Sequence, residues 1–273
     1  MEYATLNNGI KIPYVGLGVF RLTDDKIAYE TVRMALDVGY RHIDTAMIYE
    51  NEEAVGKAIR DSGIPREEIF LTTKLWNDDI RKDNVQGAFE ASLKRLGTEY
   101  VDLYLVHWPV KEKYVPVWKE MEKIYAGGKT RAIGVSNYLE HHLDELLKIA
   151  SVIPAVDQIE LHPYLTQEKL VNYLHEKNIV PEAWSPFCAK KNNLLEEPIL
   201  KEIAKKYGKT PAQVVLRWDI QRGIVVIPKS SNLSRQKENL DIFDFELSDE
   251  DMKRINSLNR DQRVGSHPDE ITF

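Results

Sequence analysis

The chain has 273 residues and a formal net charge of −6, which argues against general binding to nucleic acid or to anionic membranes, because both need a basic surface. Its single cysteine, Cys188, excludes an intrachain disulfide and a cysteine-rich zinc site. The sequence lacks a signal-peptide pattern and the roughly 20 apolar residues of a membrane helix, so we expect a cytoplasmic protein.

The chain opens with a predicted β-hairpin, because apolar residues flank the turn signal at residues 7–9. Eight short apolar runs then alternate with amphipathic helical stretches. The runs are YVGLG (14–18), YRHID (40–44), IFLTTK (69–74), VDLYLVH (101–107), TRAIGVS (130–136), AVDQIEL (155–161), IVPEAWS (179–185) and GIVVIPKS (223–230). Eight βα units favour a single (β/α)₈ TIM barrel domain over residues 1–273, since closure leaves no sheet edge. The pattern alone does not exclude the alternative of an open doubly wound sheet.

Amphipathic stretches between the runs predict the helices of the barrel. They cover residues 26–39, 51–63, 84–97, 115–128, 141–150 and 167–178, and several end on glycine, as a helix often does. Extra C-terminal helices are predicted over residues 233–243 and 248–259, the second beginning at Ser248 and acidic residues. Extra helices near the eighth strand of a barrel often help to bind phosphate.

Polar residues that could carry chemistry stand at the ends of three successive runs. Asp44, Lys74 and His107 occupy these ends, and Tyr49 follows five residues after Asp44. A TIM barrel keeps its catalytic groups at the carboxyl ends of its strands, so we expect these side chains to converge. Tyr49 could act as a general acid, and a cation about 4 Å away could lower its pKa by up to ~3 before desolvation opposes this. Lys74 could supply that cation.

Asp44 would keep a buried Lys74 charged, and His107 could donate a hydrogen bond to a substrate oxygen. Each of the four residues taken alone also fits an ordinary role in packing or at a solvated rim. Their joint placement at strand ends is what indicates function.

Other kinds of site have less support in the sequence. The histidines are scattered, and the adjacent His141 and His142 are predicted to point in different directions from a solvated helix start. A serine hydrolase would need a GxSxG motif, which is absent. The stretch GLGVFR (16–21) lacks the third glycine of a dinucleotide fingerprint and is predicted to be a strand turn.

Several longer motifs in fixed order carry a resemblance to a known family. They are GYRHIDTAMIYENEEAVG (39–56), TTKLWN (72–77), LYLVHWP (103–109), AIGVSN (132–137), QIELHP (158–163), AWSP (183–186) and IPKSSNLSRQKEN (227–239). In these motifs the chain resembles the aldo-keto reductase family, and especially its short-tailed bacterial and protozoan members. The resemblance implies that Asp44, Tyr49, Lys74 and His107 are catalytic. A nicotinamide cofactor would give hydride to a carbonyl carbon while Tyr49 protonates the oxygen, with no metal required.

The same resemblance assigns residues to the cofactor and the substrate. Ser136, Asn137 and Gln158 would bond the nicotinamide carboxamide, Trp184 would stack on its ring, and Ser185 would also contact the cofactor. The 2′-phosphate would face Lys229, Ser230, Ser231 and Arg235, and the adenine would face Glu238 and Asn239. The two cations favour NADPH over NADH. Phe20, Met47, Trp76 and Trp108 would line an aromatic substrate mouth for aldehydes and ketones of modest size.

The chain departs from the family pattern at two places. Trp184 replaces a common tyrosine, which keeps stacking intact, and Phe187-Cys188-Ala189 stands where many members carry Leu-Gly-x-Gly. The second change alters a loop that would fold over the pyrophosphate. The short tail after the eighth strand, which ends in SHPDEITF, disfavours narrow recognition of a bulky steroid.

The sequence therefore predicts a monomeric NADPH-dependent carbonyl reductase whose physiological carbonyl is open. A cofactor-binding regulatory subunit of the same fold and a metal-assisted barrel hydrolase are the alternatives.

Overall fold

The computed structural model describes residues 2–188 and 192–273. It begins with the predicted hairpin, in which β1 (Tyr3–Thr5) pairs antiparallel with β2 (Lys11–Pro13). Gly9 takes a positive φ of 85° in the turn, a conformation that favours glycine. Apolar hairpin residues such as Leu6 and Ile12 pack against the first residues of several barrel strands, including Phe70 and Val225. The hairpin therefore covers the amino-terminal end of the barrel, opposite the end where the strands finish.

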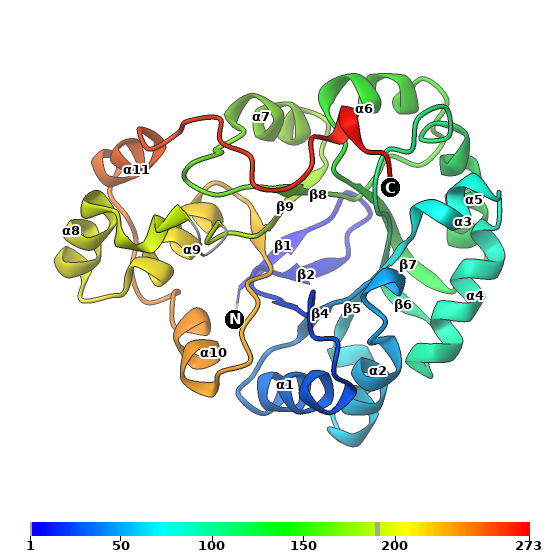
Figure 1. The fold of residues 1–273 in the computed structure, drawn as a ribbon, viewed down its shortest axis with the longest axis horizontal. Coiled ribbons are helices and arrows are strands. Elements are labelled where there is room, and N and C mark those ends of the chain that lie inside the picture. The colour runs from blue at the N-terminus through cyan, green and yellow to red at the C-terminus, as the bar shows by residue number, and fades with distance from the viewer. Residues whose placement is uncertain (1, 189–191) are drawn as a thin grey trace.

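Eight parallel strands form the central sheet of the described residues, in the order of the chain. They are β3 (Leu17–Gly18), β4 (His42–Asp44), β5 (Phe70–Leu75), β6 (Val101–Val106), β7 (Thr130–Ser136), β8 (Val156–Glu160), β9 (Val180–Trp184) and β10 (Val225–Val226). Val15 forms a parallel bridge with Val226, and Gly16 N–H donates to the Val226 carbonyl at 2.8 Å. This contact joins the last strand to the first and confirms the predicted (β/α)₈ barrel (Figure 1).

Helices surround the strands (Figure 1). They are α1 (Asp25–Asp37), α2 (Glu52–Asp61), α3 (Asn77–Arg81), α4 (Val85–Leu96), α5 (Pro116–Ala126), α6 (Glu140–Leu147), α7 (Glu168–Glu176), α8 (Pro198–Tyr207), α9 (Pro211–Gln221), α10 (Leu233–Leu240) and α11 (Asp249–Asn256). Ser248 accepts the N–H of Asp251 at the start of α11, as its position predicted. None of the helices in the described ranges has the length and apolar character that crossing a membrane requires.

The predicted extra helix after the eighth strand is shorter than expected. It ends at Leu240 because Asp241 has a ψ of 59°, outside the helical region. Two longer helices, α8 and α9, lie between β9 and β10. α9 starts at Pro211 behind a capping box, in which Thr210 and Gln213 each accept the other's backbone N–H.

The segment after α11 turns back across the end of the barrel where the strands finish. Figure 1 shows it in red, running from α11 past α7 toward α6. The buried carboxylate of Glu160 accepts the backbone N–H groups of Val264 (2.6 Å) and Gly265 (2.9 Å). Further along, Phe273 stacks on Trp76 at 5.8 Å between ring centroids. The tail is short, yet it reaches the aromatic residues predicted to line the substrate mouth.

Candidate active site

Lys74 is the centre of a buried polar cluster at the carboxyl ends of β4 and β5. Its Nζ donates to Oδ1 of Asp44 at 2.6 Å and to the carbonyl oxygen of Thr45 at 2.9 Å. The Tyr49 hydroxyl lies 3.5 Å from the same ammonium, on a 3₁₀ turn that follows β4 (Met47–Tyr49). Adjacent parallel strands bring these groups together, as their placement in the sequence predicted.

Burial and neighbouring charge have opposite effects on the pKa values of Lys74 and Tyr49. Burial lowers the pKa of Lys74, but the charge and hydrogen bond of Asp44 outweigh it, so the pKa lies above its ordinary value and the ammonium stays charged. Burial raises the pKa of Tyr49 more than Lys74 lowers it. Lys74 taken alone lowers the Tyr49 pKa, as predicted, but desolvation of the phenolate is the larger effect, so the net shift is upward. The phenol is protonated at neutral pH, the state in which it can donate a proton.

His107 follows β6 directly and faces Tyr49 edge to face, with 5.8 Å between the ring centroids. Burial, and then the charge of Lys74, hold its pKa well below the usual range, so the imidazole is neutral. Its Nδ1 is buried and has no hydrogen-bond partner among the described residues. A neutral imidazole carries one proton and one lone pair, so His107 can donate a hydrogen bond from one nitrogen only.

Gln158 links the cluster to a second buried acid. Its Nε2 donates to Oδ2 of Asp44 and to Oε2 of Glu182, both at 2.8 Å. Both protons of the amide are directed at carboxyl groups, which leaves its oxygen as the part that can accept a hydrogen bond from a ligand. Burial, reinforced by Asp44, raises the pKa of Glu182 to about 8.

His42 lies beside Glu182 inside the barrel, with its Nε2 3.5 Å from Oε1. Burial lowers the pKa of His42 to about 3, so this ring is neutral. Glu182 and His42 were not among the predicted site residues. The signal for Glu182 was an acidic residue in the middle of the apolar run IVPEAWS, which can be buried only if its charge is neutralised or paired.

The predicted carboxamide and stacking residues lie together at the ends of β7 and β9. Asn137, at a positive φ of 63°, donates from Nδ2 to the His107 carbonyl (3.0 Å) and to Ser136 Oγ (3.0 Å). The indole N–H of Trp184 donates to Oδ1 of Asn137 at 2.9 Å. The half-buried Trp184 ring is thereby fixed relative to His107. Ser185 follows it with a positive φ of 53° and is exposed.

The predicted phosphate-binding residues surround the amino-terminal end of α10. Asn232 caps this helix by accepting the N–H of Arg235 at 3.1 Å, and the amide of Gln236 holds the preceding loop by donating to the Ser230 carbonyl at 2.9 Å. Arg235, Lys229 and Ser231 are exposed, whereas Ser230 is buried. Exposed cations at a helix amino terminus suit an anionic group.

The two residues predicted for the adenine differ in environment. Glu238 is partly buried, and its Oε1 accepts a hydrogen bond from the Thr210 hydroxyl at 2.6 Å. Asn239 is a buried residue of α10, and its side chain bonds the Tyr40 phenol. Both side chains therefore already have protein partners.

Aromatic residues predicted for the substrate gather beside Tyr49 and His107. The Phe20 ring lies 5.0 Å from that of Tyr49, and Trp76 packs edge to face on His107 at 5.1 Å. Trp108 contacts Phe273 edge to face at 5.4 Å, and Met47 is partly buried in the 3₁₀ turn before Tyr49. Phe273 was missed, because an aromatic residue in a tail gives no periodic signal.

His141 and His142 do not point apart as predicted. Their ring centroids are 4.0 Å from one another, and both Nε2 atoms lie close to Oδ1 of Asp269. His142 is buried rather than solvated. The prediction is wrong because α6 begins at Glu140, where the first turn and the returning tail place both rings beside one carboxylate.

Only part of the altered loop Phe187-Cys188-Ala189 is described, since Ala189 lies outside the described residues. Cys188 is buried at a positive φ of 57°, and Asn192 Nδ2 donates to its Sγ at 3.2 Å. The loop therefore turns sharply directly after β9.

Comparison with known proteins finds one family over most of the chain. Residues 15–260 match the model of the Aldo/keto reductase family. The chain is 53% identical to the Glyoxal reductase of Bacillus subtilis over 98% of this chain and 96% of the relative. It is 51% identical to the 9,11-endoperoxide prostaglandin H2 reductase of Trypanosoma cruzi over 97% of this chain and 94% of that one.

Among solved structures, MGS-M4, an aldo-keto reductase enzyme from a deep-sea metagenome library, superimposes with a TM-score of 0.95. It is 46% identical, and the match covers 99% of this chain and 100% of that one. The chain therefore belongs to the aldo/keto reductase family of oxidoreductases.

Proposed function

We propose that the protein reduces small aldehydes and ketones with NADPH, and that Tyr49 is the proton donor. The observation that carries this proposal is the Tyr49 phenol, which burial keeps protonated 3.5 Å from the charged Lys74. A proton donor and a cation beside it are what the forming alkoxide of a carbonyl reduction requires.

The residues present fit a nicotinamide cofactor. Gln158 offers its amide oxygen, and the half-buried Trp184 offers a flat ring held by Asn137. At α10, the exposed Arg235 and Lys229 suit the 2′-phosphate that distinguishes NADPH from NADH. The cofactor supplies hydride to the carbonyl carbon when it is bound.

The side chains of the protein handle the proton. His107, neutral at working pH, donates a hydrogen bond to the carbonyl oxygen and orients it toward Tyr49. Tyr49 then gives its phenolic proton to that oxygen, so the substrate leaves as an alcohol. The phenolate that forms is stabilised by Lys74, which stays charged through its 2.6 Å contact with Asp44. Solvent returns the proton to Tyr49 before the next turnover.

The aromatic residues around the site favour small or flat carbonyl compounds. Phe20, Trp76 and Trp108 supply apolar faces, and the tail residue Phe273 contacts both tryptophans. The relatives named for glyoxal and for a prostaglandin endoperoxide differ widely in substrate. We favour the smaller class, because the Phe273 side chain already occupies space beside Trp76 and Trp108.

A nicotinamide absorbance assay tests this function. NADPH should be consumed in the presence of small aldehydes such as glyoxal or a reactive aromatic aldehyde, and Tyr49→Phe should sharply lower turnover while NADPH still binds. General acid catalysis contributes about 10²–10⁴-fold, so the loss should reach that size. Tight NADPH binding with no reduction across a broad carbonyl panel would favour a regulatory subunit. We also propose a monomer, and a light-scattering mass near twice the 31.5 kDa chain would contradict it.

A further inference from the structure

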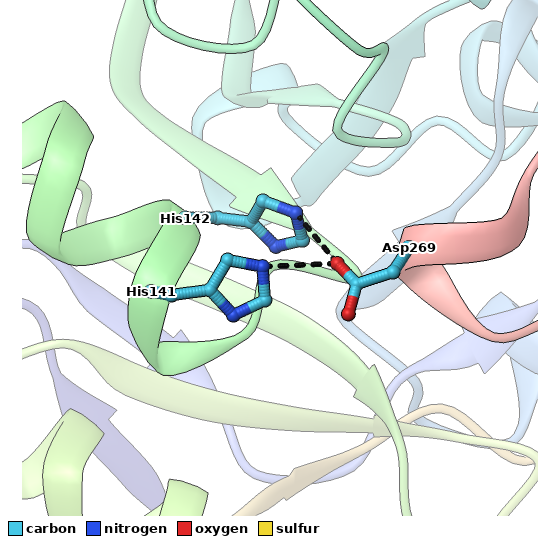
Figure 2. A group of neighbouring side chains, drawn as sticks. All are labelled: His141, His142 and Asp269. Atoms are coloured by element: carbon cyan, nitrogen blue, oxygen red, sulfur yellow. Dashed lines mark hydrogen bonds and ion pairs between the residues drawn. The ribbon is translucent and has the colours of Figure 1, made fainter.

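Two histidines of α6 and one aspartate of the tail form a cluster outside the active site. Nε2 of His141 lies 2.9 Å from Oδ1 of Asp269, and Nε2 of His142 lies 3.1 Å from the same oxygen. Figure 2 shows both imidazole rings directed at this carboxylate from the first turn of the helix. The three side chains come from segments more than 120 positions apart in the chain, so the fold and not local sequence brings them together.

The spacing of these atoms matches that of ligands around a small cation. One ligand atom from each residue lies within 4.8 Å of the others. In a tetrahedral zinc site with bonds of about 2.0–2.1 Å, ligand atoms are roughly 3.3 Å apart. The two nitrogen-to-oxygen distances therefore need to open by only a few tenths of an ångström. Two imidazoles and one carboxylate form a donor set that suits Zn²⁺ and its neighbours.

A nearby histidine could complete the site. Nδ1 of His267 lies 3.8 Å from Oδ2 of Asp269, the other oxygen of that carboxylate, and accepts the Asp269 backbone N–H at 3.3 Å. His267 and His141 are both exposed, so they can shift toward a cation at small cost. A water molecule is the other fourth ligand that zinc accepts with three protein ligands.

Binding of a cation changes which ring nitrogen of His142 carries the proton. Its Nδ1 accepts the N–H of Leu139 at 3.1 Å, so the neutral ring carries its proton on Nε2 and donates it to Asp269. Burial lowers the pKa of His142 to about 4, so no second proton competes at neutral pH. A cation can bind Nε2 only in the other tautomer, so the ring proton moves from Nε2 to Nδ1 and the bond that Nδ1 accepts from Leu139 is lost. Binding is therefore expected to loosen the first turn of α6 at Leu139.

We propose that His141, His142 and Asp269 bind a divalent transition metal ion, Zn²⁺ first among them, and that the ion fastens the tail to α6. The site is distinct from the proposed catalytic residues, and it needs neither cofactor nor substrate. Phe273, which packs on Trp76 and Trp108, lies only four residues after Asp269. An ion that holds Asp269 would therefore also restrain Phe273 at the end of the barrel.

The full, untagged chain is first treated with a chelator, and calorimetric titration of Zn²⁺ into it then tests the proposal. The expected result is one ion per chain, with affinity weakened by about tenfold or more in His141→Ala and in Asp269→Asn. Both side chains are partly exposed, so neither change should unfold the protein. Asp261→Asn removes an exposed acid from the same tail and should bind as the unaltered chain does. Equal affinity in all four proteins, or no binding by the unaltered chain, would overturn the site.

Two further readouts examine the ligands and the tail. Co²⁺ bound in place of Zn²⁺ should give the visible absorption bands of a four-coordinate ion, and Asp269→Asn should lose them. Hydrogen exchange should slow in residues 264–273 on addition of Zn²⁺. Unchanged exchange there, with one ion bound, would overturn the proposal that the ion fastens the tail.

Discussion

The ammonium of Lys74 lies 2.6 Å from the carboxylate of Asp44, and the two side chains are only 0% and 2% exposed. A buried ion pair of this kind is weak evidence for net stability, but removing one partner leaves an uncompensated charge. Lys74→Met should therefore destabilise the protein by about 3–5 kcal/mol, measured by urea unfolding at neutral pH. Lys57→Met, at the exposed pair with Asp61, is the control and should leave unfolding unchanged. Similar midpoints for both variants would contradict the expectation.

Glu182 should make stability fall as pH rises. Its pKa is about 8 in the folded protein against an ordinary value of 4.5, so the folded state holds a proton that the unfolded state has lost between these values. Stability attributable to Glu182 is therefore highest below pH 4.5 and declines by about 1.4 kcal/mol for each unit of pH up to 8. Glu182→Gln should flatten this part of the profile in denaturant unfolding from pH 5 to 9. A parallel profile for the variant would show that Glu182 titrates normally.

Arg235 should determine the choice between the two nicotinamide cofactors. Arg235→Ala should weaken NADPH binding by about tenfold to a hundredfold, because a charge-assisted hydrogen bond is worth about 1.5–3 kcal/mol. NADH has no 2′-phosphate, so its affinity should not change. Cofactor fluorescence titration measures both. Lys237→Ala, also an exposed cation on α10, is the matched control, and equal losses in the two variants would point to general attraction of an anion.

Phe273 should affect the KM for the substrate and not the affinity for the cofactor. Its ring stacks on Trp76 with an interplanar angle of 5°, so Phe273→Ala should uncover an apolar face at the proposed substrate end. We expect KM to change for aromatic aldehydes, with smaller changes for glyoxal and none in NADPH affinity. Steady-state kinetics on both substrates test this. Phe245→Ala, near Tyr207 on the outer helices, is a control for loss of a remote aromatic side chain.

Much of the barrel was predictable from the sequence, because hydrophobic periodicity and turn-forming residues act over a few neighbouring positions. The run IFLTTK, for example, predicts a buried strand that ends at Lys74, and the buried strand β5 ends one residue later, at Leu75. The convergence of Asp44 and Lys74 also followed, since neighbouring parallel strands finish at the same end of a barrel.

What the sequence did not predict depends on desolvation and on long-range contacts. The pKa of Tyr49 depends on how far burial exceeds the effect of Lys74, and spacing carries no measure of burial. The meeting of His142 with Asp269 depends on the path of an irregular tail, which no periodicity describes. The orientation of Gln158 likewise follows from Glu182, a partner on another strand.

The junction between the first and last barrel strands, β3 and β10, should become more stable when the cofactor binds. β3 and β10 are only two residues long, and Val15 and Val226 bridge them through a short ladder. Lys229 and Ser230 follow this ladder directly, so a dinucleotide held there would also hold the ends of the sheet together. We expect the amides of Gly16 and Val226 to be among the first in the barrel to exchange with solvent. Saturating NADPH should slow their exchange and raise the melting temperature together, because a ligand that binds only the closed barrel adds its binding free energy to closure.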